Sequence, residues 1–236
     1  MSKSLVPPAP ETLFTLAGTR VQADLGAPLH LGAVVGLCWT LVGRRYPAMR
    51  LLGRLRLTLI WTLLFEVAYF AHSVGHIFTA RAVGAPMDAL VLTAVQQVNI
   101  YYNDNVSPDA HLGRAVGGPL ASLIAGLTVR SLRRLLPPGP FARDLLDTFL
   151  GFTALIGGLS LVPLPSLDGG SLLKWGVYSS TGDLQEAART VREAGMNVAL
   201  FSGILAIAAF LLRKPLAGAA LSVFGVAAAL DSLRRD

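Results

Sequence analysis

The chain has 236 residues, of which 53% are hydrophobic and only 14% are charged, and its mean hydropathy is +0.57. This composition excludes an ordinary soluble domain and is typical of a membrane protein. The formal net charge is +6, but the arginines cluster at the ends of apolar segments, where membrane proteins place them. We therefore expect a lipid bilayer around this chain and no nucleic acid as a partner.

Six apolar segments have the length, or nearly the length, of a transmembrane helix, which requires about 20 residues. They cover residues 28–43, 55–79, 113–136, 142–164, 196–212 and 215–231. These segments predict an all-α, multi-pass integral membrane protein with about six transmembrane helices. Residues 1–27 lack the basic and apolar regions of a signal peptide. We interpret them as an N-terminal tail and residues 28–236 as one polytopic membrane domain.

A polar stretch separates the fourth apolar segment from the fifth. Residues 183–194 have the pattern of an amphipathic helix, with Asp183 in the N-cap position. Gly195 is expected to end this helix, because glycine commonly follows the last helical residue. The stretch is therefore predicted to lie at the membrane surface or in water.

The most informative residues lie in the second apolar segment, where His72 and His76 are four positions apart and share one face of a helix. In the HExxH signature two such histidines bind Zn²⁺, and the glutamate after the first acts as general base. Here that residue is Ser73, whose hydroxyl does not accept a proton as a carboxylate does. The pattern predicts a metal site more readily than a peptidase. Two histidines satisfied by polar neighbours are the alternative.

Two further motifs follow in the chain. Residues 117–123 read GGPLASL, and residues 160–170 read SLVPLPSLDGG. In this order, each beside a membrane segment, the three motifs resemble those of the site-2 protease family of intramembrane zinc metalloproteases. That family carries HExGH, then a glycine-proline-leucine motif, then N-x-x-P-x-P-x-L-D-G. The resemblance covers residues 55–178 and is specific, because it requires all three motifs together.

The resemblance implies that His72, His76 and Asp168 are the protein ligands of a Zn²⁺ ion, with Asp168 placed in a turn. Three protein ligands with an open fourth position are typical of a catalytic zinc site. Two residues depart from the family pattern. Ser73 replaces the catalytic glutamate, and Ser160 replaces an asparagine that is expected to hold the substrate backbone. Both departures affect chemistry or substrate binding, whereas the metal ligands remain.

Three other regions carry expectations. Gly118 and Pro119 lie in the second motif, and a proline there would kink or open the third helix to help receive an extended peptide; a packing notch is the alternative. Residues 85–112 correspond to a membrane-associated hairpin in the family, which predicts a short strand or re-entrant element between helices 2 and 3. Glu66 lies two turns before Ser73 and is expected to face the bundle interior with a polar partner.

These features predict a site-2 protease-like core that retains a zinc-binding framework. We expect a pseudoprotease with weak or no peptidase activity that binds a transmembrane partner or substrate. The alternative is an active intramembrane zinc endopeptidase with a non-standard base, for which the candidates are Glu66, Asp104, Asp109 and His111. A hydrogen-bonded histidine–aspartate cluster without metal is the structural alternative for the site.

Overall fold

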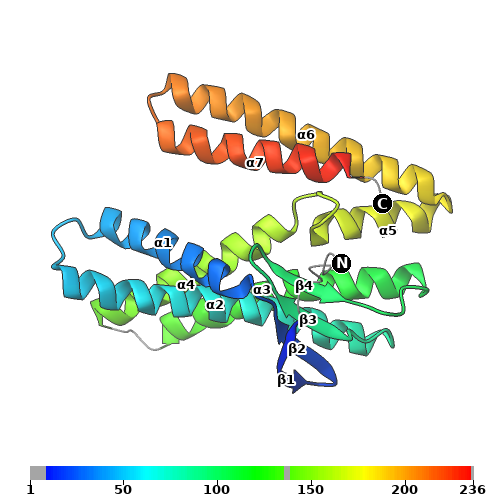
Figure 1. Cartoon of the computed structure of the whole chain (residues 1–236), viewed down its shortest axis with the longest axis horizontal. Coiled ribbons are helices and arrows are strands. Elements are labelled where there is room, and N and C mark those ends of the chain that lie inside the picture. The colour runs from blue at the N-terminus through cyan, green and yellow to red at the C-terminus, as the bar shows by residue number, and fades with distance from the viewer. Residues whose placement is uncertain (1–8, 136–138, 235–236) are drawn as a thin grey trace, which may run out of the picture.

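The computed structural model describes residues 9–135 and 139–234, and within these ranges the chain forms seven helices and one four-stranded sheet (Figure 1). The helices are α1 (Ala27–Arg45), α2 (Leu51–Ala82), α3 (Pro108–Leu135), α4 (Pro140–Ser160), α5 (Asp168–Thr181), α6 (Leu184–Leu211) and α7 (Pro215–Leu233). The strands are β1 (Glu11–Leu16), β2 (Thr19–Ala23), β3 (Ala89–Leu92) and β4 (Gln97–Ile100). Among the described residues, α1, α2, α3, α6 and α7 are long and apolar enough to cross a membrane.

Helix α4 corresponds to the fourth predicted span but begins with charged residues. Arg143, Asp144 and Asp147 lie in its first turns. Asp144 pairs with Arg45 of α1 at 2.9 Å, and Asp147 pairs with Arg133 of α3 at 2.8 Å. These contacts tie the polar start of α4 to its neighbours, while its remaining length packs against α2 and α3.

The four strands form one sheet in the order β1-β2-β3-β4. Strands β1 and β2 make an antiparallel hairpin, β2 pairs with β3 in parallel, and β3 pairs with β4 in an antiparallel hairpin. The last hairpin confirms the strand element predicted within residues 85–112. The sequence did not indicate the first hairpin, because residues 11–23 were interpreted as part of a tail. Residues 1–8 of that tail lie outside the described residues.

Asp168, expected in a turn, is the first residue of α5. The two glycines after it allow the helix to begin against the preceding loop. A Cβ atom at Gly169 would collide with the carbonyl group of Leu161, and one at Gly170 with that of Leu164. The absence of side chains at these two positions therefore lets a helix start where the sequence indicated only a turn.

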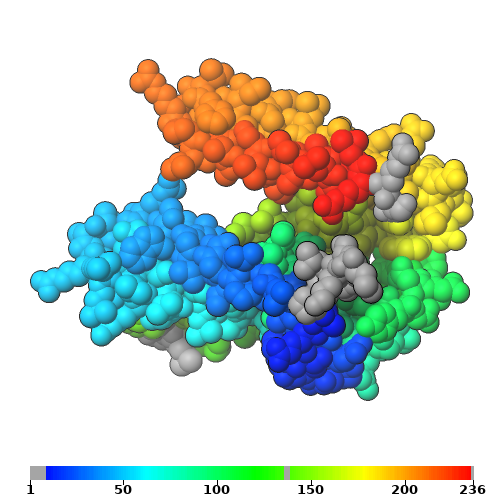
Figure 2. Space-filling view, in the orientation of Figure 1, coloured from blue at the N-terminus to red at the C-terminus, as the bar shows by residue number. Residues whose placement is uncertain are grey.

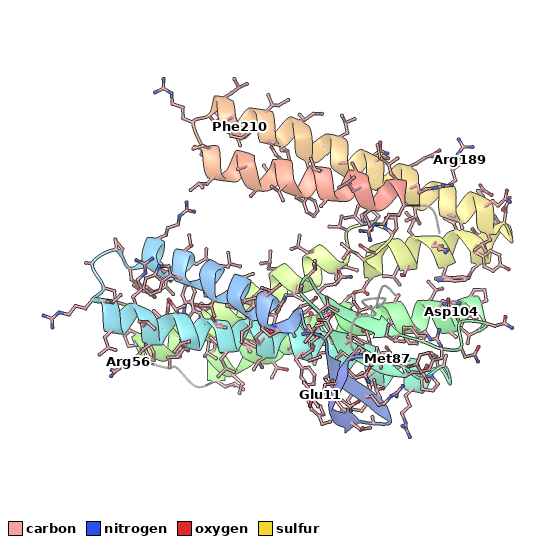
Figure 3. The ribbon with its side chains drawn as sticks, viewed as in Figure 1. Glu11, Arg56, Met87, Asp104, Arg189 and Phe210 are labelled. Carbon is pink, nitrogen blue, oxygen red and sulfur yellow. The ribbon has the colours of Figure 1, made fainter. Side chains whose placement is uncertain are left out.

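Helix α6 is continuous from Leu184 to Leu211, so the prediction that Gly195 ends a helix is wrong. Gly195 instead packs against Ser232 of α7, where a Cβ atom would meet the serine hydroxyl. The predicted N-cap is confirmed, because the Asp183 carboxylate accepts hydrogen bonds from two backbone amides of the first turn. Figure 3 shows Arg189 near the polar start of α6 and Phe210 at its apolar end.

Helices α6 and α7 form a hairpin that runs along one side of the molecule, at the top of Figure 1. Helix α5 joins this hairpin to the rest, because it packs against both α3 and α6. Figure 2 shows open space between the hairpin and α1 in this view. The other main contact is between α2 and α3, the two helices that carry most of the candidate site.

Glycines allow α2 and α3 to approach closely. Gly75 of α2 faces the backbone carbonyl of Gly117 in α3, and a Cβ atom on either glycine would collide with the opposite helix. Helix α3 continues through Pro119 to Leu135, so it is not opened there as the sequence suggested. The structure thus favours the packing-notch alternative for this motif over an unwound helix.

Candidate metal site

Three potential metal ligands converge between α2 and the start of α5. Nε2 of His72 lies 3.2 Å from Oδ2 of Asp168, and Nε2 of His76 lies 3.3 Å from Oδ1. The two Nε2 atoms are 3.3 Å apart. His72 and His76 are buried, and the Asp168 side chain is 15% exposed. The structure therefore brings together all three ligands that the sequence indicated, in a group that could hold a metal ion.

The outer nitrogen of each imidazole is held by α3. Nδ1 of His76 lies 2.8 Å from the Arg114 carbonyl oxygen and 3.4 Å from the Gly118 amide nitrogen. The shorter contact requires Nδ1 to donate, because a carbonyl oxygen only accepts. Nδ1 of His72 lies 2.9 Å from the Ser122 hydroxyl. The Arg114 contact leaves the Nε2 lone pair of a neutral His76 directed at the other ligands, as in metal-binding histidines.

The spacing of the three ligand atoms fits zinc. Tetrahedral zinc with bonds of about 2.0–2.1 Å separates its ligand atoms by about 3.3–3.4 Å, close to the observed 3.2–3.3 Å. Within the described part of the chain, Oδ2 of Asp168 is buried without a hydrogen bond. Burial raises the pKa of Asp168, but the neighbouring imidazoles of His72 and His76 outweigh it and lower the pKa to about 2. The carboxylate is thus ionised at neutral pH, as a ligand must be.

Gly118 of α3 lies directly over the ligand atoms. A Cβ atom at this position would collide with Nε2 of both His72 and His76. The second motif therefore contributes to the site through a missing side chain. The sequence associated Gly118 with substrate, whereas the structure places it against the metal ligands.

Ser73, at the position of the family's catalytic glutamate, is buried beside the site. Its hydroxyl donates a hydrogen bond to the side-chain oxygen of Gln97, the first residue of β4. The backbone amide of Gln97 in turn donates to the Tyr69 hydroxyl at 3.0 Å. These bonds attach strand β4 to α2 next to the metal ligands. Gln97 was not identified from the sequence.

A cavity of about 1070 Å³ opens beside the three ligands. Its wall includes Ser73 and Gln97, residues of α3 and α5, and the start of α6. Ser160 also lines this cavity, but its hydroxyl donates to the Gly157 carbonyl of the same helix at 3.1 Å. Pro119 is not among the described residues that line it. The cavity is large enough for several residues of a second chain.

Glu66 is too far along α2 to lie beside Ser73, but it is not left alone in the apolar interior. Its Oε1 atom lies 3.3 Å from Nε2 of His30 in α1. This contact gives Glu66 the polar partner that was predicted, and the partner comes from a neighbouring helix. Glu66 lines a second cavity and not the one around the metal ligands.

Of the other candidate bases, Asp104 and the buried His111 line the large cavity, whereas Asp109 does not. Asp104 lines it, but its carboxylate is 71% exposed and accepts a hydrogen bond from the Arg114 guanidinium at 3.1 Å. The His111 ring stacks on Trp175 with centroids 3.6 Å apart. Asp109 is exposed and lies outside the described lining. None of these groups is brought against the metal ligands by a hydrogen bond within the described residues.

Arg114 is a site residue that the sequence analysis missed. Its buried guanidinium donates to the carbonyl groups of Ala85 and Asn103 and lies 4.0 Å from the centre of the Tyr101 ring. Burial raises the pKa of Tyr101 to about 12, although the Arg114 charge acts in the opposite direction. An arginine within a predicted membrane segment was the available signal, because such residues are costly unless partnered.

Comparisons with known proteins show what the chain is similar to in sequence and in fold. No family model matches the chain. The chain is 22% identical over 191 residues to a zinc metalloprotease of Methanocaldococcus jannaschii and 28% identical over 199 residues to a putative zinc metalloprotease of Synechocystis. Each alignment covers 80% of this chain and 51% of the relative, so the chain spans about half the length of these curated proteins.

The fold has a match among solved structures. A site-2 protease from Methanocaldococcus jannaschii superimposes with a TM-score of 0.59 and 18% identity over 97% of both chains. This similarity establishes the fold, and the curated relatives add sequence similarity to metalloproteases. The candidate spans and these relatives together indicate an integral, multi-pass membrane protein. The chain thus has the site-2 protease fold and is similar in sequence to curated zinc metalloproteases.

Proposed function

We propose that this protein binds one Zn²⁺ ion through His72, His76 and Asp168 and receives a transmembrane segment of a partner in the adjacent cavity, with little or no peptidase activity. The observation that carries the proposal is the convergence of three ligand atoms, 3.2–3.3 Å apart, beside a serine at the position of the general base. The curated relatives are named zinc metalloproteases, which supports zinc as the metal.

The chain's own residues would hold the metal in a fixed geometry. The Arg114 carbonyl fixes the proton of His76 on Nδ1, and Ser122 holds the ring of His72. A bound zinc ion would supply Lewis acidity, which in active enzymes polarises a carbonyl group or lowers the pKa of water. The missing element is a nearby carboxylate that takes up the proton.

The residues that line the large cavity support the proposal of low peptidase activity. Its carboxylates, among the described residues, are Asp168 and Asp104. Asp168 is one of the proposed ligands, and Asp104 is engaged by Arg114. The Ser73 hydroxyl donates to Gln97 and cannot replace a carboxylate as proton acceptor.

An active peptidase with a non-standard base is the second candidate, and one observation favours it. Asp104 lines the same cavity as the three ligands and carries the only carboxylate there besides Asp168, within the described lining. For Asp104 to act as the base, its contact with Arg114 would have to break. We therefore place this function second.

Metal content and cleavage test the proposal in one set of purified proteins. We expect about one Zn²⁺ per chain, and a sharp loss of zinc in His72→Ala with the helical content retained. Metal-free wild-type protein that folds normally would reject the metal site.

Cleavage of a helix-destabilised transmembrane substrate tests the second part of the proposal, which is the low peptidase activity. We expect background activity from the wild type, because loss of a general base costs about 10²–10⁴-fold in rate. The double variant Ser73→Glu with Ser160→Asn should exceed either single variant, and Ser73→Ala with Ser160→Asn is the matched control without a carboxylate. Robust zinc-dependent cleavage by the wild type, lost in Asp104→Asn, would establish the second candidate instead.

A further inference from the structure

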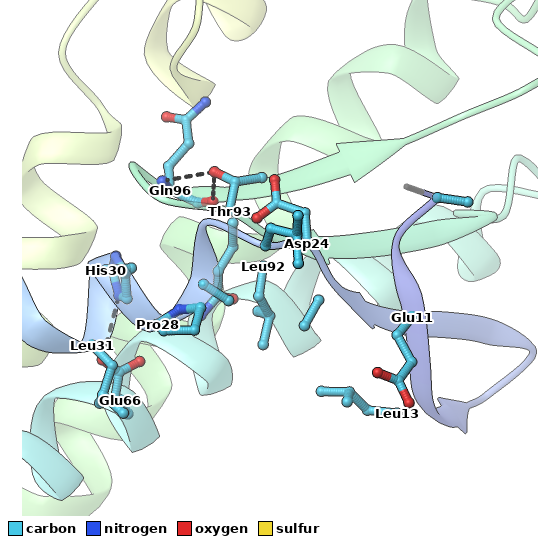
Figure 4. Close-up of a pocket in the computed structure, with 15 residues that line it drawn as sticks. Glu11, Leu13, Asp24, Pro28, His30, Leu31, Glu66, Leu92, Thr93 and Gln96 are labelled. Atoms are coloured by element: carbon cyan, nitrogen blue, oxygen red, sulfur yellow. Dashed lines mark hydrogen bonds and ion pairs between the residues drawn. The ribbon is translucent and has the colours of Figure 1, made fainter. Parts of the chain in front are cut away.

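A second cavity, of about 600 Å³, lies between the N-terminal hairpin, α1 and the middle of α2 (Figure 4). Leu13, Leu31 and Leu92 contribute apolar walls from β1, α1 and β3. His30 and Glu66 lie next to each other on one side of it in Figure 4. The cavity therefore combines an apolar body with one polar pair, which is the usual composition of a ligand pocket.

The polar pair has unused hydrogen-bonding capacity. Nε2 of His30 and Oε1 of Glu66 are 3.3 Å apart, and within the described residues both atoms are buried without a hydrogen bond of good geometry. Two more carboxylates, from Glu11 and Asp24, line the cavity, and the described lining contains no lysine or arginine. In a chain of net charge +6, this pocket is locally acidic and favours a cationic group.

The second cavity shares lining residues with the large cavity beside His72, His76 and Asp168. His30, Gln96 and Gln97 line both. Glu66 precedes Ser73 by seven residues on the same helix, which corresponds to about 10 Å along the axis. An extended chain advances about 3.3 Å per residue, so this separation equals about three residues of a segment lying along both cavities.

The position of Glu66 indicates where the cation comes from. Glu66 is the sixteenth residue of the 32-residue helix α2, so in a membrane-spanning α2 it would lie far from both helix ends, near which lipid headgroups are found. A lysine ammonium on a flexible four-carbon stem suits this depth, because the stem packs on apolar walls and the head offers three donors. An amine-bearing lipid headgroup would have to enter far below its usual level.

We propose that the His30–Glu66 cavity is a subsite for a lysine side chain of the bound segment, about three residues from the residue that faces His72, His76 and Asp168. The inference rests on the proposed function, since it assigns a specificity to the same partner-binding site. The ammonium group binds Oε1 of Glu66 and Nε2 of His30, and the stem lies against Leu31 and Leu92.

The first experiment tests the subsite without a partner segment. n-Hexylammonium mimics the lysine side chain, and n-hexanol has the same stem without the charge. In neutral detergent, the dependence of Tm on hexylammonium concentration should give an affinity about ten- to a hundredfold weaker in Glu66→Gln than in the wild type. Glu193→Gln, which changes an exposed carboxylate on α6, is the matched control and should equal the wild type. Equal effects of hexylammonium and hexanol on the wild type would overturn the subsite.

The second experiment uses zinc-loaded protein in nanodiscs and a fluorescent transmembrane segment. Lysine is placed at successive positions around its helix-destabilised centre, and norleucine at the same position provides the uncharged reference. We expect the lysine peptide to bind at least about tenfold tighter than its reference at one position about three residues from the centre. Glu66→Gln should abolish this difference and leave binding of the norleucine peptide unchanged.

The outcomes separate the two proposals. Binding of the norleucine peptide with no gain from lysine, or a gain that persists in Glu66→Gln, overturns the subsite and leaves the proposed function intact. Failure of every peptide to bind overturns the proposed function, and with it the subsite as a partner site. Displacement of hexylammonium by phosphatidylethanolamine and not by the lysine peptide assigns the cavity to a lipid and overturns the proposal.

Discussion

The substitution Gly118→Ala adds one methyl group at the point where α3 lies over the metal ligands. Its Cβ atom would collide with Nε2 of both His72 and His76. Nonbonded heavy atoms require about 3.5 Å or more, so either α3 must shift away from α2 by about 1 Å or both imidazoles must rotate. Because Gly75 and Gly117 hold the two helices in backbone contact, we expect the imidazoles to be displaced.

The expected loss of zinc affinity follows from this displacement. Metal sites hold their ligands to within about 0.2 Å of the preferred distances. Removing a group that only orients a ligand costs about 10–100-fold in metal affinity. Displacing two ligands by several times that tolerance should therefore weaken zinc binding by at least about 100-fold.

Two other glycines provide matched controls. Gly117→Ala would collide with Thr79 and the Gly75 backbone, so it should lower stability through helix packing. Gly158→Ala in α4 meets nothing within 4 Å and should leave stability unchanged or raise it by about 0.5–1 kcal/mol. Comparison of the three variants separates damage to the metal ligands from damage to the fold.

The assay is competition for zinc between the purified protein and a fluorescent chelator in neutral detergent, with the unfolding transition recorded for each variant. We expect Gly118→Ala to lose far more zinc affinity than Gly117→Ala for a comparable loss of stability. A Gly118→Ala protein that folds and binds zinc as tightly as the wild type would refute it.

Two further predictions concern stability outside the spanning helices. Burial raises the pKa of Tyr101 to about 12, above the unfolded value of about 10. The stability that the buried, neutral phenol adds to the folded state is therefore fully present below about pH 10 and is lost as the pH rises toward 12. Over this pH range the free energy of unfolding of the wild type should fall by up to about 2–3 kcal/mol more than that of Tyr101→Phe. Equal decreases in the two proteins would contradict the raised pKa of Tyr101. Asp183→Ala should cost about 0.5–2 kcal/mol in unfolding free energy through loss of the α6 cap, whereas Asp183→Asn, which keeps a capping oxygen, should cost less; equal costs would argue against the cap.

The three candidate metal ligands could be predicted from the sequence because each lies in a short local motif. His72 and His76 share a helical face by their spacing alone, and Asp168 follows from its place in the third motif. Their convergence depends on the packing of α5 against α3, which no local pattern describes. The role of Gly118 was missed for the same reason, since a glycine gives no sign of the atoms that it allows to approach.

The N-terminal strands were missed because their pairing is non-local. Strand β2 pairs with β3, so Val21 lies opposite Leu90 although 68 residues separate them in the sequence. A short hairpin is marginal by itself, and the polar residues within 11–23 resemble an exposed tail. The misplaced helix end at Gly195 has a similar cause, because the contact with Ser232 that requires a glycine belongs to another helix.

The hydrogen bonds around the ligands bear on whether the site serves a metal or only helix packing. Nδ1 of His76 donates to the Arg114 carbonyl, so the Nε2 atom of a neutral His76 is an acceptor, and so is each oxygen of the ionised Asp168. A metal-free cluster of neutral imidazoles has one hydrogen among these atoms, on Nε2 of His72, and a second donor requires protonation of His76 on Nε2, which adds a positive charge to the buried site. Buried acceptors without donors are destabilising. A cation bound by these three atoms, which lie 3.2–3.3 Å apart, would satisfy the acceptors without a second proton, and this supports the proposed zinc site.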